Sequence, residues 1–344
     1  NICGGTKLSF NKKTVRDIDV AGKRVLVRVD YNVPVENGKI TDDYRIKKSL
    51  PTIEYLLEKN AKIILISHLG RPEGKVNKKY SLQPCALRLE KLLDKKVAFA
   101  GDCQGEEVKK LAENLKNGEI LLLENLRFYV EEETNDDNFA KNLAGLADVF
   151  VQDGFGVVHR AHASTDAITR HIPSVAGLLL EKEVDTITNV MEKPERPLMA
   201  IIGGAKISDK IEILKRLINI ADFVAVGGAM ANTFLLAEGI SIGKSLAEKD
   251  EVPLAKEISD AARKKALRQP FVFYLPPDGV VATDKFKPRF TLIVDWYAHV
   301  IAAIADSLTL PLPSITRFLS VSLMLVILPL PWHFLAVCTR RLKN

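Results

Sequence analysis

The chain has 344 residues, of which 47% are hydrophobic and 27% charged, and it carries a formal net charge of +6 at pH 7. This composition is ordinary for a folded globular protein and argues against extensive disorder, and the length favours two domains over one. The cysteines Cys3, Cys85, Cys103 and Cys338 lie far apart without a CxxC pair. That spacing argues against a disulfide framework or a zinc site and favours a reducing, cytoplasmic location.

Short apolar runs alternate with stretches of helical spacing along most of the chain. The runs, which we expect to be strands, cover 24–29, 62–66, 97–99, 119–123, 148–151, 198–202 and 222–226. The helical patterns cover 43–59, 81–94, 104–116, 136–146, 180–193, 206–219, 229–238 and 247–266. Such alternation is typical of an α/β fold with largely parallel sheets and flanking helices.

The helical stretch 180–193 is rich in charge and is followed by two prolines, after which the strand and helix rhythm restarts. We interpret it as a hinge helix that joins two α/β domains, an N-terminal domain over 1–179 and a C-terminal domain over 194–306. From 307 to 344 leucine, serine and proline crowd together, and this apolar tail no longer follows the rhythm.

Polar side chains follow four of the predicted strands in the first half of the chain. Asp30 and Asn32 follow the first, His68 and Arg71 the second, Arg127 the third and Arg160 the fourth. Ligands of open α/β sheets bind beyond the carboxyl ends of strands, so these residues predict one basic cleft that suits carboxylate and phosphate. A lone arginine is more often a solvated surface residue, and His162 fits a structural histidine better than a catalytic base.

Two glycine turns stand in the second half of the chain. Gly203 and Gly204 end a predicted strand and precede Lys206 and Lys210, while Gly227 and Gly228 end the next strand. Glycines let backbone approach a ligand and a helix N-terminus attracts phosphate, so the first turn is a candidate phosphate site. The signal is weak, because neither turn is a Walker A or dinucleotide motif.

Seven sequence blocks resemble, in order, those of phosphoglycerate kinases. They are VRVDYNVP (27–34), DYRIKKSLPTI (43–53), SHLGRP (67–72), LLLENLRF (121–128), FGVVHRAHAS (155–164), AIIGGAKISDKI (200–211) and GGAMANTFL (227–235). The resemblance covers roughly 12–300. It implies phosphoryl transfer between 1,3-bisphosphoglycerate and ADP in glycolysis, with ATP/ADP and Mg²⁺ as cofactors, in a cytoplasmic monomer without a nucleic-acid or membrane partner.

The resemblance also implies roles for individual residues. The 3-phosphoglycerate ligands would be Asp30, Asn32, Arg45, His68, Arg71, Arg127 and Arg160. The nucleotide would contact Gly203, Lys206, Lys210, Gly227 and Gly228. Arg45 and Lys206 would be catalytic, because both would stabilise charge on the transferring phosphoryl group.

The end of the chain departs from this pattern. The family's later NGP-type turn and its GGGDT-type loop, whose aspartate helps hold magnesium-nucleotide, have no counterpart after 286. The resemblance therefore implies that the C-terminal domain is incomplete. A shift of reading frame is our first interpretation of 307–344. The alternatives are a membrane anchor over the uncharged run 318–339, although two prolines interrupt it, and a divergent folded replacement. A catalytically defective form that still binds 3-phosphoglycerate is the alternative function, and nucleic-acid binding is disfavoured because aromatic platforms are lacking.

Overall fold

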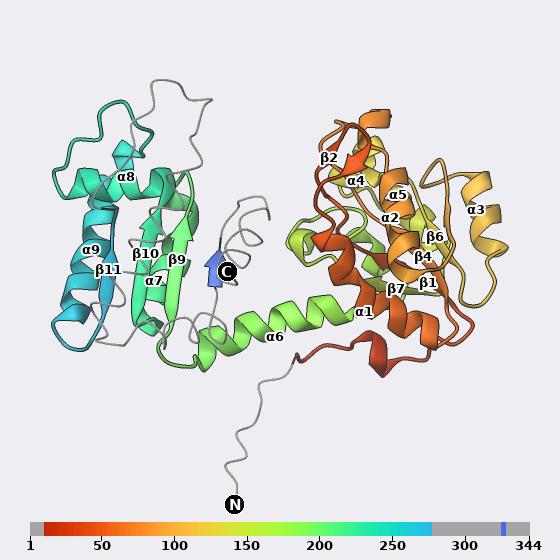
Figure 1. Ribbon diagram of the computed structural model, residues 1–344, viewed down its shortest axis with the longest axis horizontal. Helices are drawn as coiled ribbons and strands as arrows, with labels where there is room; N and C mark the ends of the chain where they lie inside the picture. Colours follow the sequence, from red (N-terminus) through yellow and green to blue (C-terminus); the bar gives the residue numbers. More distant parts are fainter. Residues whose placement is uncertain (1–9, 277–324, 328–344) are drawn as a thin grey trace, which may run out of the picture. The chain divides into compact units, whose positions relative to one another are not determined.

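The computed structural model describes residues 10–276 and 325–327. The chain divides into two compact units, Asn1–Thr186 (unit 1) and Ile187–Asn344 (unit 2). The boundary falls inside helix α6 (Leu178–Glu192), which the sequence predicted as a hinge helix (Figure 1). Each unit contains a parallel sheet with flanking helices, so the predicted α/β fold is confirmed.

Unit 1 is built on a parallel sheet with the strand order β5-β6-β4-β1-β7-β8 among its described residues. The strands are β1 (Arg24–Arg28), β4 (Lys62–Ile66), β5 (Val97–Phe99), β6 (Ile120–Leu122), β7 (Val149–Gln152) and β8 (Ser174–Ala176). In the register, Val25 of β1 lies between Ile63 of β4 and Val149 of β7. Because the strands are parallel, the carboxyl ends of β6, β4, β1 and β7 are neighbours at one edge.

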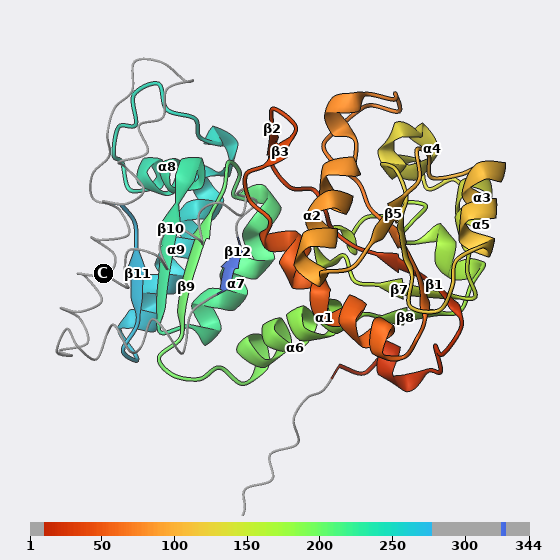
Figure 2. The same cartoon turned by 45° about the vertical axis from the view of Figure 1, so that its right-hand side comes forward.

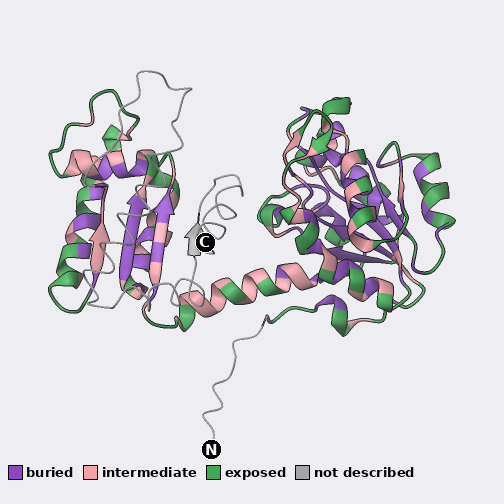
Figure 3. Ribbon diagram, viewed as in Figure 1, coloured by how far each residue is buried: buried purple, intermediate pink, exposed green. Residues whose placement is uncertain are grey.

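Both faces of this sheet are buried, which explains why its strands are continuous apolar runs. Val25 and Val27 pack in one hydrophobic cluster with residues of α1 (Tyr44–Glu58) and α2 (Gln83–Leu93). Leu26 packs in a second cluster with residues of α3 (Glu106–Glu113) and α5 (Asp137–Ala144). Figure 2 shows these helices around the sheet, and Figure 3 shows its strands as buried.

Several short elements of unit 1 were not predicted. They are the hairpin β2 (Val35–Glu36) and β3 (Lys39–Ile40), the helix α4 (Val130–Glu133) and the strand β8. Short 3₁₀ helices add to these at Val15–Asp17, Lys78–Tyr80, Leu126–Phe128, Phe155–Val157 and Ala167–Arg170. These elements have two to four residues and, unlike the equally short β5 and β6, were not recognised as separate apolar runs, so the sequence pattern did not reveal them.

Unit 2 contains the parallel sheet β11-β10-β9-β12. Its elements are β9 (Met199–Gly203), η6 (Ser208–Lys210), α7 (Ile211–Ile220), β10 (Phe223–Gly227), α8 (Gly228–Ala237), η7 (Lys249–Glu251), α9 (Val252–Ala266), β11 (Val272–Tyr274) and β12 (Leu325–Ile327). The predicted helix 206–219 begins later than expected, at Ile211, because the chain first forms the 3₁₀ turn η6. Lys206 therefore lies in the loop before the helix.

The two faces of the unit 2 sheet differ within the described residues. Ala200, Ile202 and Val224 are fully buried in a cluster with residues of α7, α8 and α9. On the opposite face, Phe223 and Ala225 are buried, but Ile201 and Tyr274 beside them are only half-buried. Unit 2, as described, is thus an α/β domain with one fully packed sheet face, in agreement with the predicted incomplete domain.

Of the tail 307–344, only β12 lies among the described residues, and it pairs in parallel with β9. The three interpretations of the tail, and the lack of the two family loops after 286, otherwise concern residues that lie outside the described ones. No helix within the described ranges is both long and apolar enough to cross a membrane.

Candidate active site

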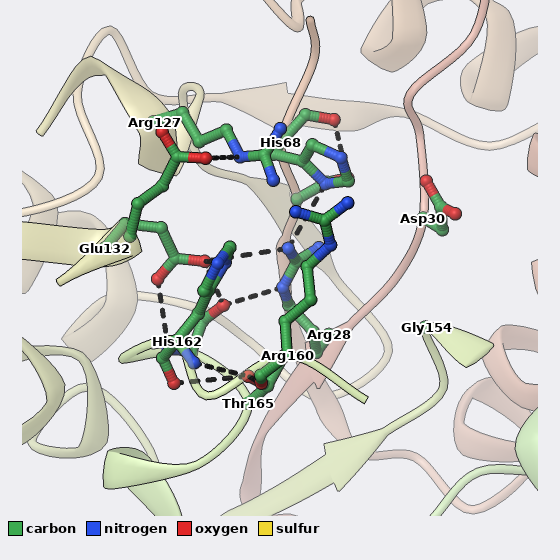
Figure 4. A network of polar contacts seen from close by, with 12 residues as sticks. Arg28, Asp30, His68, Arg127, Glu132, Gly154, Arg160, His162 and Thr165 are labelled. Atoms are coloured by element: carbon green, nitrogen blue, oxygen red, sulfur yellow. Dashed lines mark hydrogen bonds and ion pairs between the residues drawn. The ribbon is translucent and has the colours of Figure 1, made fainter. Parts of the chain in front are cut away.

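The loops after β1, β4, β6 and β7 bring the predicted basic residues of unit 1 together. Asp30 follows β1, His68 follows β4, and Arg127 lies in the 3₁₀ helix Leu126–Phe128 after β6. Arg160 follows β7 and the 3₁₀ helix Phe155–Val157. Figure 4 shows His68 with Arg127 and Arg160 beside it. The parallel strand order therefore assembles one cluster from segments that are distant in sequence.

A buried arginine that was not predicted lies at the centre of this cluster. Arg28 is 1% exposed, and its Nη2 lies 3.7 Å from Oε1 of the fully buried Glu132 (Figure 4). Its Nε donates a hydrogen bond of 2.8 Å to Ser164 Oγ, which in turn donates to Glu132 Oε1 at 2.6 Å. These contacts compensate the cost of removing two charges from water.

The same arginine fixes the state of His68. Arg28 Nη2 lies 3.2 Å from His68 Nδ1, and a guanidinium can only donate, so Nδ1 accepts and the neutral ring carries its proton on Nε2. Burial lowers the pKa of His68 well below its ordinary value, and the nearby positive charges, first that of Arg28 and then that of Arg127, lower it further. His68 is therefore neutral at physiological pH and can offer one N–H donor to a ligand.

Two residues of the first loop hold other parts of the cluster. Arg45 Nη1 and Asp30 Oδ2 form an ion pair of 2.7 Å. Asn32 Oδ1 accepts a hydrogen bond of 2.8 Å from the Gly70 amide, and Arg127 Nη1 donates one of 3.0 Å to the Gly70 carbonyl. Gly70 has a φ of +63°, and a Cβ there would approach a ring carbon of Tyr80 to 2.4 Å. Only glycine fits this turn.

Arg71 and Arg160 are the exposed members of the cluster. Burial lowers the pKa of the Arg127 guanidinium, and the charges of Arg160 and Arg71 lower it further, whereas Glu133 acts in the opposite direction. The arginines are thus close enough to repel one another. A doubly anionic ligand would relieve that repulsion, and planar guanidinium groups suit carboxylate and phosphate oxygens.

His162 is largely buried, and its Nδ1 lies 4.0 Å from Glu132 Oε1. Burial lowers the pKa of His162. The ring packs next to the buried pair of Arg28 and Glu132 (Figure 4), which agrees with a structural histidine.

In unit 2 the two glycine turns lie side by side. Gly203 pairs with Gly227 in the register of β9 and β10, and the Met230 amide donates a hydrogen bond of 2.9 Å to the Gly204 carbonyl. Gly228 has a φ of +67°, and a Cβ there would lie 2.9 Å from Gly204 O. The turns touch only because both lack side chains, so glycine is required at this contact.

The two predicted lysines flank these turns. Lys210 is the N-cap residue of α7 and is half-buried. A Cβ added to Gly204 would lie 3.2 Å from Lys210 Cε. Lys206 is exposed in the loop between β9 and η6. Gly203 is buried and Gly204 and Gly227 are half-buried, whereas Gly228 is exposed. Accessible backbone of glycine turns beside two ammonium groups can bind phosphate oxygens.

The described residues contain no group of three or more His, Cys, Asp and Glu side chains that could hold a metal ion. We assign no step to the magnesium that the sequence resemblance implies.

The chain matches the family model described as phosphoglycerate kinase over residues 15–302. It is 52% identical over 271 residues to the phosphoglycerate kinase of Pelotomaculum thermopropionicum, covering 79% of this chain and 68% of that protein. It is 53% identical over 273 residues to that of Moorella thermoacetica, with the same coverage of 79% and 68%.

Solved structures agree with this result. The phosphoglycerate kinase of Coxiella burnetii is 40% identical with a TM-score of 0.64, covering 79% of this chain and 68% of that one. The enzyme of Pyrococcus horikoshii is 33% identical with a TM-score of 0.63, covering 72% and 65%. The chain belongs to the phosphoglycerate kinase family.

Proposed function

We propose that this chain is a kinase that transfers a phosphoryl group between 1,3-bisphosphoglycerate and ADP in glycolysis. The observation that carries the proposal is the arginine cluster around His68 in a member of this family. In the direction from 1,3-bisphosphoglycerate to ADP, the bond between the acyl phosphate's bridging oxygen and phosphorus breaks. A bond from an oxygen of the ADP β-phosphate to the same phosphorus forms. The products are ATP and 3-phosphoglycerate.

We assign 3-phosphoglycerate to unit 1. Its carboxylate and phosphate would pair with Arg71, Arg127 and Arg160, and His68 would donate its Nε2 proton. Asp30 and Asn32 hold Arg45 and Gly70 in place, and their oxygens can accept a hydrogen bond from the substrate hydroxyl group. The existing hydrogen bonds keep these groups in position before the ligand arrives, which reduces the cost of binding.

We assign the nucleotide to unit 2. Its phosphates would lie against Gly203, Gly227 and Gly228 and be paired by Lys210. Arg45 and Lys206 would stabilise the charge that spreads over the phosphoryl oxygens in the transition state. Magnesium would be bound with the nucleotide and lower its charge. Helix α6 is the proposed hinge, and the cytoplasmic location, the monomeric state and the lack of a nucleic-acid partner remain predictions.

A coupled assay of the purified chain tests this function. With ATP, magnesium and 3-phosphoglycerate, the product 1,3-bisphosphoglycerate would be consumed by an NADH-dependent dehydrogenase and followed by absorbance. Turnover within the range usual for enzymes, about 1–1000 per second, would support the proposal. Arg45→Ala should abolish most of the turnover. Arg170→Ala is the control and should not, because Arg170 is an exposed arginine that pairs with Asp137 and Asp166. Absence of turnover in the unaltered chain would contradict the proposal and favour the catalytically defective form.

A further inference from the structure

The loop that carries Lys206 is held on both sides by hydrogen bonds. On its N-terminal side, the Gly204 carbonyl accepts from the Met230 amide at the start of α8. On its C-terminal side, Ile207 and Ser208 are held by Glu248, a residue about 40 positions later in the chain. Lys206 lies between these two attachment points.

Glu248 makes three contacts with this loop. Its Oε2 accepts from the Ile207 amide at 2.5 Å and from the Ser208 amide at 3.2 Å. Its Oε1 accepts from Ser208 Oγ at 2.8 Å. The amides at the start of a helical segment lack backbone partners, and a carboxylate is well suited to satisfy them.

Glu248 is itself attached to α8. Its amide donates a hydrogen bond of 3.1 Å to Oγ1 of the buried Thr233. Two residues earlier, the Leu246 carbonyl accepts from Asn232 Nδ2 at 2.8 Å. Helix α8 starts at the second glycine turn, so Glu248 connects the helix that follows one turn with the loop that follows the other.

The carboxylate is charged under physiological conditions. Partial burial acts to raise its pKa, but the hydrogen bonds from Ser208 and Ile207 and the nearby charge of Lys206 together lower the pKa of Glu248. An ionised acceptor forms stronger hydrogen bonds than a neutral one.

We propose that Glu248 is a positioning residue for the nucleotide site. It fixes the backbone of the loop between Gly204 and Ser208 and thereby the position of Lys206. The proposal rests on the assignment of the nucleotide to unit 2. A purely electrostatic role for Glu248 predicts the opposite effect on binding, because a negative charge near a phosphate site weakens binding, and its removal would then strengthen it.

The test compares Glu248→Ala and Glu248→Gln with the unaltered chain. The glutamine side chain keeps an acceptor oxygen for the two amides but lacks the charge. Glu257→Ala is the matched control, because it removes an exposed carboxylate of unit 2 that pairs with Lys215. Hydrogen exchange at the Ile207 and Ser208 amides measures the attachment, and calorimetry with magnesium and ADP measures its consequence.

We expect Glu248→Ala to speed exchange at both amides and to weaken ADP binding about tenfold, as the loss of charge-assisted hydrogen bonds predicts. The ADP affinity of Glu248→Gln should stay within about threefold of that of the unaltered chain. Glu257→Ala should bind ADP as the unaltered chain does. Tighter ADP binding in Glu248→Ala, or unchanged exchange, would overturn the proposal. If the alanine variant does not fold, Glu248→Asp replaces it, because the shorter side chain cannot reach both amides.

If the unaltered chain itself does not bind ADP, the assignment of the nucleotide to unit 2 fails, but the attachment of the Lys206 loop by Glu248 is still tested. The exchange measurement then decides alone: faster exchange in Glu248→Ala supports the attachment by Glu248, and equal exchange overturns it.

Discussion

In unit 1 the candidate site is organised around charges that are almost fully buried, whereas in unit 2 it is organised around backbone. Arg28 and Glu132 are 1% and 0% exposed, but Lys206 and Gly228 are exposed. Buried charges must be paired within the protein, so the charges at the centre of the unit 1 cluster also contribute to the stability of the fold, whereas Arg71 and Arg160 at its surface are exposed. In unit 2 the exposed side chain of Lys206 can change with little effect on stability, whereas the close backbone contact at Gly228 cannot.

The largest expected effect comes from removing the buried carboxylate of unit 1. Glu132→Ala leaves Arg28 buried without a carboxylate, and we expect it to lower the free energy of unfolding by about 3–5 kcal/mol. Urea denaturation measures this loss. Glu131→Ala, in the same helix α4, is the control and should cost far less. Equal losses in the two variants would show that the buried pair does not stabilise unit 1.

The glycine contact of unit 2 should give the next largest effect. Gly228→Ala and Gly243→Ala both place a side chain at positive φ, at +67° and +59°, which costs about 1–2 kcal/mol. A Cβ at Gly228 also meets Gly204 O at 2.9 Å, whereas nothing lies within 4 Å of one at Gly243. Thermal unfolding should therefore show the larger loss for Gly228→Ala, and only this variant should weaken ADP binding. Identical behaviour would rule out a role for the close contact.

The protonation of His68 should make unit 1 sensitive to acid. The pKa of His68 is lowered in the folded state, by burial first and then by the arginines, so the unfolded chain binds a proton that the native chain does not. The contribution of His68 to the free energy of unfolding is therefore complete above about pH 6.5. Below that pH it falls by at most about 1.4 kcal/mol per pH unit.

Comparison with His68→Asn isolates this contribution. Asp153, whose pKa burial raises to about 6, acts in the opposite direction, with stability that falls as pH rises from about 3.8 to 6. It is present in both proteins, so its effect cancels in the difference between them. Urea denaturation between pH 5 and 8 gives the free energy of unfolding of each protein as a function of pH. If the two pH dependences were parallel, the conclusion that His68 is neutral in the folded protein would be wrong.

The smallest effect on stability should come from Lys206→Ala. We expect an unchanged melting temperature, because the side chain is exposed, and a fall in turnover that exceeds any change in substrate affinity. Lys265→Ala is the matched control in the same unit. Lys265 Nζ donates to the carbonyls of Ile218 at 2.6 Å, Asn219 at 3.1 Å and Ala221 at 2.6 Å, so its loss should lower the melting temperature. The reverse pattern would make Lys206 a structural residue.

The sequence predicted seven strands of the two parallel sheets and the places where polar residues follow them, because buried parallel strands are apolar runs and their ends form one edge. It did not predict β8, β11 and β12, which have three residues each. It missed Arg28, although an arginine inside the apolar run 24–29 is a signal of a buried, paired charge. It also missed Glu132 and Glu248. Both act through contacts with residues far away in the chain, at Ser164 and Ser208, and no local pattern encodes such a contact.

Calorimetric titration with 3-phosphoglycerate tests the division of ligands between the two units most directly. The unaltered chain should bind this ligand, and Arg45→Ala in unit 1 should weaken binding by about 1.5–3 kcal/mol, as expected for a lost charge-assisted contact. Lys206→Ala in unit 2 should leave the affinity unchanged. Unchanged affinity in Arg45→Ala together with lost affinity in Lys206→Ala would contradict the assignment of 3-phosphoglycerate to the arginine cluster.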